Sequence, residues 1–238
     1  MRDVLDQLDG ARAVLFDVDG TLYRQGPVRR SMVARLVRAH LTRPATGLTV
    51  MRVISAYRTA QETLREEGFE GDVTDAQLAM AAARTGLDTD AVREVVERWM
   101  EVEPLGAVAV SGRSGLVELL DELGRRGTKL GALSDYPAVA KLEALGIADR
   151  FAVVMSAQDP RVQAFKPNPK GLRIALEALE VEPSAAVYVG DRAEVDEVAA
   201  AAVPMRCVLV GGSRRATRAR RAATTRDAAQ PAEPLEAT

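Results

Sequence analysis

The chain has 238 residues and a formal net charge of −2, because 32 lysines and arginines nearly balance 34 aspartates and glutamates. This balance gives no global argument for a nucleic-acid partner, and a single cysteine, Cys207, excludes an internal disulfide. No apolar stretch approaches the length of a membrane span, and the N-terminal residues lack the apolar region of a signal peptide. We therefore expect a cytoplasmic protein without a membrane or nucleic-acid partner, long enough for one large domain or for a core with an insert.

The first expected element is a strand near residues 12–18. Its apolar run, residues 14–16, is typical of a buried strand and ends at Asp17. Because side chains two residues apart point to the same face of a strand, Asp17 and Asp19 are expected to lie together at its end. Two carboxylates this close repel each other, and such pairs usually share a proton or bind a cation. The alternative is a strand that simply ends in a polar turn, since Asp-Gly is a common turn signal.

Residues 27–104 contain no convincing strand and are rich in Ala, Leu, Arg and Glu. Apolar residues recur at helical spacing between Val50 and Leu64, which predicts a helix with one apolar face. Such helices bury their apolar faces against one another, so we expect a small helical bundle inserted after the first strand, with residues 104–106 as the second hinge. The helices are predicted near residues 28–41, 48–67, 75–85 and 90–103.

Three residues of this region invite a functional interpretation, but we favour a structural one. His40, the only histidine, titrates near neutrality. It falls late in the first predicted helix, where a surface or helix-end position is more common than a catalytic one. Tyr57 and Trp99 are expected in the interior of the bundle.

After residue 104 the chain alternates strands and helices. This alternation predicts an α/β fold, in which a Rossmann-like parallel sheet is covered by helices on both faces. In such a sheet, ligands bind at the carboxyl ends of the strands. Cys207 falls in the last predicted strand, where a buried thiol is expected. The strands are predicted near residues 129–134, 151–155, 186–190 and 205–210, and the helices near residues 112–126, 138–146, 169–180 and 193–202.

Polar residues stand at the ends of these strands. Ser134 ends one strand before a helix, where a hydroxyl and free backbone N–H groups suit a phosphate oxygen, although a helix cap would also explain it. Lys166 could be a solvated loop lysine, but the chain has only four lysines against 28 arginines. Asp191 follows another strand, with Asp196 five residues beyond. Glu194 is interpreted as a first-turn acid that complements the helix dipole.

Four motif-like segments follow one another at these strand ends. They are Asp-Val-Asp-Gly-Thr from Asp17, the strand-ending Ser134, Lys166 before a proline, and Gly-Asp-x4-Asp from Gly190 to Asp196. In this order they resemble the motifs of the haloacid dehalogenase-like (HAD) hydrolase superfamily, most of whose members are phosphatases. The helical insert is similar to the C1-type cap of the phosphoglycolate phosphatase-like subgroup. The resemblance covers roughly residues 12–212.

The resemblance implies a HAD-like α/β core domain made of residues 1–26 and 105–212 and a helical cap domain made of residues 27–104. Residues 213–238 are rich in Arg, Ala and Thr and then contain Pro and Glu, without an apolar period. They are therefore predicted to form a disordered tail. Its arginines could touch nucleic acid, but no aromatic residue is interleaved for base stacking, which favours a solvated tail.

The family resemblance also implies catalytic roles. Asp17 would attack phosphorus and form an aspartyl-phosphate, which splits one difficult step into two. Asp19 would protonate the leaving alcohol and later deprotonate the hydrolytic water. Lys166 and Ser134 would bind the phosphoryl oxygens, and the charge of Lys166 would also stabilise the transition state, which makes this lysine catalytic as well.

A metal ion is implied because the nucleophile and the substrate are both anionic. Mg²⁺ prefers oxygen ligands, usually one or two carboxylates together with water and substrate phosphate. The candidate ligands are the carboxylates of Asp17 and Asp191 and, by the resemblance, the backbone carbonyl of Asp19. Asp196 is expected behind them, either near the waters of the metal or near Lys166.

In this family a helical cap closes over the site and selects the leaving group. Arg24, Arg52 and Arg58 are candidates to bind an anionic or polyhydroxylated leaving group, although most surface arginines are only solvated. Asp135 stands where many relatives carry Asn. Its negative charge close to a phosphate would either weaken binding or recognise a feature of the substrate.

The predicted function is that of a Mg²⁺-dependent phosphomonoester hydrolase, which acts on a small phosphorylated metabolite through an aspartyl-phosphate. Asp19 argues against a haloacid dehalogenase, which lacks an acid at this position, and a cap without lysine argues against a phosphonoacetaldehyde hydrolase. The alternatives are a β-phosphoglucomutase-like phosphoryl transferase, which would also use cap lysine and histidine, and a non-catalytic binding or regulatory relative. The residues do not indicate an oligomeric state.

Overall fold

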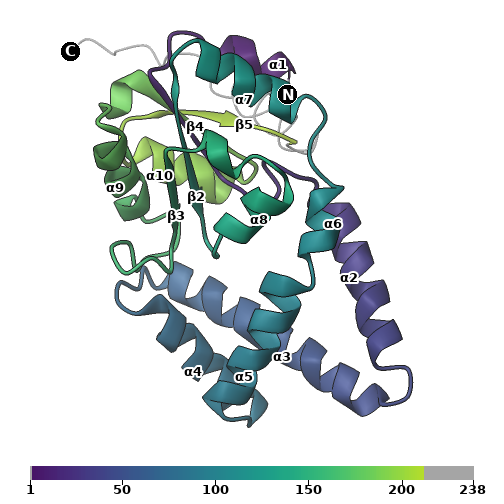
Figure 1. The fold of residues 1–238 in the computed structure, drawn as a ribbon. Coiled ribbons are helices and arrows are strands. Elements are labelled where there is room, and N and C mark those ends of the chain that lie inside the picture. Colours follow the sequence, from purple (N-terminus) through teal and green to yellow (C-terminus); the bar gives the residue numbers. More distant parts are fainter. Residues whose placement is uncertain (1, 212–238) are drawn as a thin grey trace, which may run out of the picture.

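The computed structural model describes residues 2–211 (Figure 1). Within this range, five strands form one fully parallel sheet. They are β1 (Ala13–Phe16), β2 (Lys129–Ser134), β3 (Val153–Ser156), β4 (Ala186–Gly190) and β5 (Arg206–Leu209). Their order across the sheet is β3-β2-β1-β4-β5. The predicted tail, residues 213–238, lies outside the described residues.

β1 lies at the centre of the sheet, between β2 and β4. Its register places Phe16 beside Ala132 of β2 and Val189 of β4. Every residue of β1 and of β4 is buried, because both faces of a parallel sheet are covered. The carboxyl ends of these neighbouring strands therefore open at one edge of the sheet.

Helices cover both faces of the sheet. They are α1 (Arg2–Leu5), α7 (Leu116–Arg125), α8 (Val139–Ala144), α9 (Lys170–Leu179) and α10 (Val198–Ala201), with the short turns η1 (Asp6–Leu8), η3 (Ala148–Arg150), η4 (Pro183–Ala185) and the π-helical η5 (Ala193–Glu197). On one face, α1, α7 and α8 share an apolar cluster with β1 that includes Phe16, Leu120 and Leu142. On the other face, α9 and α10 share a cluster that includes Tyr188 and Leu176.

A second group of helices lies beside the carboxyl ends of the strands (Figure 1). It consists of α2 (Gln25–Ala39), α3 (Pro44–Glu66), α4 (Val73–Thr85), α5 (Thr89–Val96) and the π-helical η2 (Glu97–Val102), and α6 (Leu105–Ala109) leads back to the sheet. α3, α4 and α5 bury their apolar faces in a common cluster that contains Val53, Tyr57, Leu78 and Val92. The predicted helical bundle after the first strand is confirmed.

Local chemistry sets where several of these helices begin and end. The side chains of Asp72 and Asp88 accept hydrogen bonds from backbone N–H groups in the first turns of α4 and α5. Gly86 ends α4 in the left-handed conformation, with a φ of 75°. α3 begins at Pro44, earlier than the predicted start at residue 48, because proline fits the first turn of a helix.

Two chain connections join the cap helices to the sheet, and they lie side by side. Tyr23 and Gly112 form an antiparallel bridge. The N–H group of Arg24 donates to the carbonyl oxygen of Ser111 at 2.9 Å. An α/β core with a helical cap is therefore confirmed, whereas the domain boundaries and the second hinge stay predictions.

The isolated residues noted in the sequence have structural positions. His40 ends α2, as predicted: its ring lies 5.5 Å from the Trp99 ring, and its Nδ1 lies 3.0 Å from the carbonyl oxygen of Leu36. Tyr57 and Trp99 are buried, as predicted, whereas Cys207 in β5 is only half-buried. In the described part of the chain, no helix is both long enough and apolar enough to cross a membrane.

Candidate active site

The parallel sheet brings the predicted site residues to one edge. Asp17 directly follows β1, Ser134 is the last residue of β2, and Asp191 directly follows β4. Lys166 comes from the loop between β3 and α9, and Asp196 comes from η5. These side chains belong to segments far apart in the sequence, and they meet because the strands run in the same direction.

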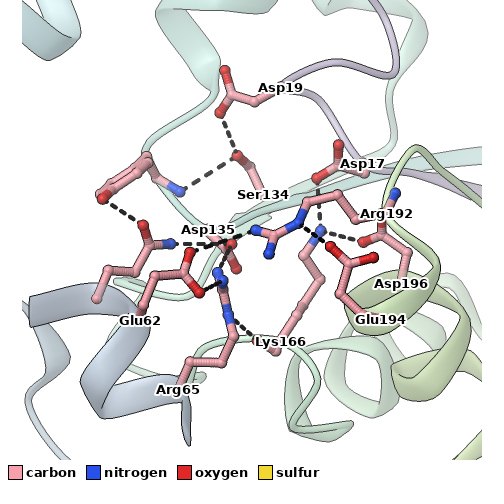
Figure 2. A network of polar contacts seen from close by, with 12 residues as sticks. Asp17, Asp19, Glu62, Arg65, Ser134, Asp135, Lys166, Arg192, Glu194 and Asp196 are labelled. Carbon is pink, nitrogen blue, oxygen red and sulfur yellow. Dashed lines mark hydrogen bonds and ion pairs between the residues drawn. The ribbon is translucent and has the colours of Figure 1, made fainter. Parts of the chain in front are cut away.

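Lys166 is the centre of a buried network (Figure 2). Its Nζ lies 2.6 Å from Oδ1 of Asp17, 2.8 Å from Oδ1 of Asp196 and 2.9 Å from the hydroxyl of Tyr188. Only 4 % of Lys166 is exposed. Burial acts to lower the pKa of this lysine, but Asp17 foremost, with a further contribution from Tyr188, raises the pKa well above its usual value. Lys166 therefore supplies a permanent positive charge beside Asp17.

Asp17 is almost completely enclosed. Its Oδ1 faces Lys166, and its Oδ2 accepts a hydrogen bond from the hydroxyl of Thr21 at 3.0 Å. Burial raises the pKa of Asp17 to about 7, although Lys166 acts to lower it. A carboxyl group with this pKa is protonated for part of the time near neutral pH. An ionised nucleophile at this position therefore needs positive charge in addition to that of Lys166.

Asp17, Asp191 and Asp196 offer carboxylate oxygens that lie within 4.8 Å of one another. Burial raises the pKa of Asp191 to about 6, and Asp196 adds to this rise. Both oxygens of Asp196 already accept hydrogen bonds, Oδ1 from Lys166 and Oδ2 from the N–H groups of Asp191 and Arg192 at 3.0 Å each. Each oxygen of Asp196 therefore accepts two hydrogen bonds, counting that of the Tyr188 hydroxyl to Oδ1, whereas each oxygen of Asp17 accepts only one. Asp17 and Asp191 are accordingly the better ligands for a hard cation such as Mg²⁺.

Gly20 makes room for Asp191. Its φ of 101° lies in the left-handed region that favours glycine, and a Cβ added there would overlap with the carboxylate of Asp191. Arg113 holds the same turn, donating from Nη2 to the carbonyl oxygen of Gly20 at 2.5 Å and from Nε to that of Thr21 at 2.8 Å. The glycine of the first motif is therefore needed for space as well as for backbone conformation.

Asp19 belongs to a second group of contacts. Lys141 of α8 places its Nζ 2.9 Å and 2.7 Å from the two carboxylate oxygens, Ser134 donates to Oδ2 at 3.2 Å, and the hydroxyl of Tyr23 donates to Oδ1. Burial acts to raise the pKa of Asp19, but Lys141 foremost, with the two hydroxyls, lowers it overall. Asp17 and Asp19 still influence each other electrostatically, yet each carboxylate has its own lysine partner.

Three residues join the site without having been predicted: Lys141, Tyr23 and Tyr188. The scarcity of lysine was a signal for Lys141, which lies on the helix that follows Ser134. Tyr188 was marked by its place in an otherwise apolar strand, where a buried phenol usually needs a hydrogen-bond partner. Tyr23 had no local signal, because its contact with Asp19 depends on how the turn after β1 folds.

Arg24, Arg52 and Arg58, the predicted cap contacts, are all exposed. The charge of Arg58 acts on the core loop after β2: burial raises the pKa of Tyr136 in this loop, and Arg58 partly opposes the rise. The role of the three arginines in binding a leaving group stays a prediction. Asp135, in contrast, has a defined partner, because Arg65 of the cap helix α3 forms an ion pair with it.

Comparison with known proteins agrees with this geometry. A family model described as a haloacid dehalogenase-like hydrolase matches residues 11–203. The chain belongs to the haloacid dehalogenase-like hydrolase family. The superfamily predicted from the four motifs is thereby confirmed, together with the predicted hydrolase class.

Relatives of this HAD-like hydrolase include phosphatases. It is 32% identical over 219 residues to the phosphoglycolate phosphatase of Rhodospirillum rubrum, a match that covers 85% of this chain and 81% of that protein. It is 31% identical over 192 residues to the glyceraldehyde 3-phosphate phosphatase of Methanopyrus kandleri, with 78% and 77% covered. Among solved structures, a 2-haloacid dehalogenase from Pseudomonas syringae pv. Tomato has a TM-score of 0.59 at 25% identity, with 85% of this chain and 89% of the other covered.

Proposed function

We propose that this HAD-like hydrolase is a phosphatase that releases inorganic phosphate from monoesters of small metabolites. The observation that carries the proposal is the 2.6 Å contact between Nζ of Lys166 and Asp17, which puts a buried cation beside a carboxylate at the open edge of the sheet. The phosphatases among its relatives support the same reaction. Asp19 supports it over dehalogenation, because haloacid dehalogenases are expected to lack an acid at this position.

In the first half-reaction, Asp17 attacks phosphorus. A bond forms between a carboxylate oxygen and phosphorus, and the bond between phosphorus and the oxygen of the leaving alcohol breaks. Lys166 and the hydroxyl of Ser134 stabilise the negative charge on the phosphoryl oxygens. The leaving oxygen takes a proton from Asp19. The negative charge of the approaching phosphate raises the pKa of Asp19 and so favours the protonated form that this step needs.

In the second half-reaction, Asp19 removes a proton from water. The water oxygen attacks phosphorus, the bond to Asp17 breaks, and inorganic phosphate leaves. Asp19 starts this step ionised because it has just given its proton to the leaving group, and the charge of Lys141 favours that ionised state. A bound phosphate competes with Asp19 for the hydroxyl of Ser134, and Lys141 and Tyr23 then keep Asp19 in place.

The proposed cofactor is Mg²⁺. Asp17 and Asp191 would hold it through carboxylate oxygens, and the backbone carbonyl of Asp19 is the predicted further ligand. When bound, Mg²⁺ would offset the negative charge that accumulates between the nucleophile and the substrate phosphate. Asp196 bonds to Lys166 and to the backbone after β4, so it would support the loop that carries Asp191.

The proposed substrate is a short phosphorylated metabolite. Two relatives are named for phosphoglycolate and glyceraldehyde 3-phosphate, which are both small. Hydrolysis is preferred over phosphoryl transfer between sugars, because residues 27–104 contain no lysine. A cytoplasmic location stays a prediction.

The test is phosphate release by the purified protein from a panel of phosphorylated sugars, small acids and nucleotides, with p-nitrophenyl phosphate as a generic ester. We expect turnover with MgCl₂ and none after chelation with EDTA. Activity that is insensitive to the chelator would exclude the Mg²⁺ mechanism. Failure to release phosphate from every ester, by a folded protein with MgCl₂, would favour a non-catalytic relative.

A further inference from the structure

One turn of the cap helix α3 contacts the core loops at the open edge of the sheet (Figure 2). Arg65 donates from Nη2 to Oδ2 of Asp135 at 2.5 Å and from Nε to the carbonyl oxygen of Lys166 at 2.6 Å. Its Nη1 donates to Glu62 at 2.5 Å, and the other oxygen of Glu62 lies 3.6 Å from Nη1 of Arg192. A single helical turn therefore connects the cap to the loops after β2, before α9 and after β4.

Each of these loops carries a candidate catalytic residue at or beside the contact. Asp135 directly follows Ser134, the contacted carbonyl belongs to Lys166 itself, and Arg192 directly follows Asp191. A shift of this turn of α3 would therefore move the backbone next to the phosphate and metal positions.

Arg65 is largely committed to protein partners, because three of its five guanidinium N–H groups donate to protein oxygens. Its side chain is only 6 % exposed, and Nε, Nη1 and Nη2 each donate to a protein oxygen. A guanidinium paired in this way with a carboxylate is held firmly, since both hydrogen bonds and charge favour one geometry. The role of Arg65 therefore follows from the contacts that it makes with the protein.

Asp135 is the residue that needs this partner. Its Oδ2 accepts from Arg65 and from Nε2 of Gln61 at 3.1 Å, and its Oδ1 is buried without a hydrogen-bond partner among the described residues. A carboxylate beside Ser134 would repel a phosphate dianion if its charge were not balanced. The cap supplies the balancing charge.

We infer that Arg65 is a positioning residue, which makes the phosphate site competent only when the cap is docked. By pairing with Asp135, it neutralises a negative charge next to the phosphate position, and by bonding to the carbonyl of Lys166 it fixes the loop of the catalytic lysine. This inference rests on the proposed phosphatase function. It also gives Asp135 a role: the affinity for phosphate depends on the position of the cap, because the charge of Asp135 is balanced only when Arg65 is in contact with it.

The test is a double-mutant cycle of Arg65→Met and Asp135→Asn, with KM and kcat for p-nitrophenyl phosphate and the inhibition constant of inorganic phosphate as readouts. Arg65→Met leaves the charge of Asp135 unbalanced, so both KM and the inhibition constant should rise about tenfold or more. Asp135→Asn removes a like charge and should lower the inhibition constant. The double variant should therefore bind phosphate better than Arg65→Met alone.

Two further variants complete the experiment. Arg65→Lys keeps the positive charge and should preserve phosphate inhibition much better than Arg65→Met. The lysine variant also provides a result if the methionine variant unfolds. Arg84→Met removes an exposed arginine of α4 and should leave all constants unchanged. Thermal unfolding of each variant accompanies the kinetics.

If Asp135→Asn lowers the inhibition constant by no larger a factor in the Arg65→Met background than in the wild-type background, the inference is overturned, because a purely structural arginine gives effects that simply add to those of Asp135→Asn. Equal losses in Arg65→Lys and Arg65→Met would overturn it as well. Both results require an active wild-type protein, so they leave the proposed phosphatase function standing. An inactive wild type would instead overturn the proposed function and this inference together.

Discussion

Lys141 on α8 holds both carboxylate oxygens of Asp19, at 2.9 Å and 2.7 Å from its Nζ. Only 7 % of Lys141 is exposed, whereas the side chain of Asp19 is 23 % exposed, so the lysine is buried and the carboxylate stays partly accessible. Asp17 is paired with Lys166 through one oxygen, Oδ1, at 2.6 Å. The first motif thus presents two carboxylates, each fixed by a lysine from a different part of the chain. The two lysines hold the proposed nucleophile, Asp17, and the proposed acid/base, Asp19, in separate contact networks.

Replacing Lys141 by Met should impair proton transfer more than phosphate binding. Asp19 would lose the cation that fixes its orientation, and we expect kcat for alkyl phosphates to fall about tenfold or more, as part of the roughly 10²–10⁴-fold that general acid–base catalysis contributes. The loss should be smaller for p-nitrophenyl phosphate, whose leaving group needs little protonation. Lys129→Met, at the opposite end of β2, is the matched control and should keep kcat for both esters. Equal losses on both esters in Lys141→Met would contradict this role.

Asp19→Ala removes the proposed acid/base itself. The loss in kcat should be on the order of 10²–10⁴-fold for alkyl phosphates and clearly smaller for p-nitrophenyl phosphate. Steady-state kinetics on a series of esters with graded leaving-group pKa measures the difference. A loss that is independent of the leaving group would mean that Asp19 acts through backbone geometry or metal binding instead.

Much of the site could be predicted because strand ends are visible in the sequence. Asp17, Ser134 and Asp191 each close an apolar run, and a parallel sheet brings such ends to one edge. The partners that fix them were not visible. Lys141 reaches Asp19 only because of the direction in which α8 leaves β2, and no local period encodes that direction.

The cap shows the same division between local and long-range information. Its helices follow from apolar spacing and N-terminal caps, which are local properties. The ion pair between Arg65 and Asp135 joins residues 70 positions apart, and it depends on how α3 crosses the sheet edge. The π-helical turns η2 and η5 also differ from the predicted helices, because apolar periodicity does not separate an α-helical from a π-helical turn.

Protons and Mg²⁺ are expected to compete for the acidic cluster. In the metal-free fold, burial raises the pKa of Asp17 to about 7 and that of Asp191 to about 6, from the ordinary aspartate value of 3.8. Protonation of these groups therefore stabilises the fold fully at low pH, and this contribution is lost as the pH rises through their folded pKa values. Because Mg²⁺ replaces the protons, it should raise Tm more at about pH 8 than at about pH 5.5.

Thermal unfolding with and without MgCl₂ at the two pH values measures this linkage. Asp191→Asn is the informative variant, since it removes one proposed ligand and should lose most of the Mg²⁺-dependent shift. The same shift at both pH values in the wild type, or a full shift in Asp191→Asn, would contradict the assignment of the metal position.

Gly20→Ala should damage the site through sterics alone. The backbone at φ 101° is strained for alanine by about 1–3 kcal/mol, and the added Cβ would push Asp191 out of place. We expect a lower Tm together with a weaker response to Mg²⁺. Gly26→Ala is the control, because a Cβ there meets only the flexible end of Arg30 at an ordinary distance. Retention of full Mg²⁺ stabilisation in Gly20→Ala would show that Asp191 does not need this space.

The central claim is that Asp17 carries the phosphoryl group during turnover, and acid-quench mass spectrometry tests it most directly. Asp19→Asn slows hydrolysis of the intermediate, so this variant mixed with p-nitrophenyl phosphate and MgCl₂ should carry a phosphate on the peptide that contains Asp17. The double variant Asp17→Asn, Asp19→Asn should carry none, and Asp17→Asn alone should release no phosphate while keeping the wild-type fold. A phosphate adduct on another residue, or near-normal turnover by Asp17→Asn, would contradict the account.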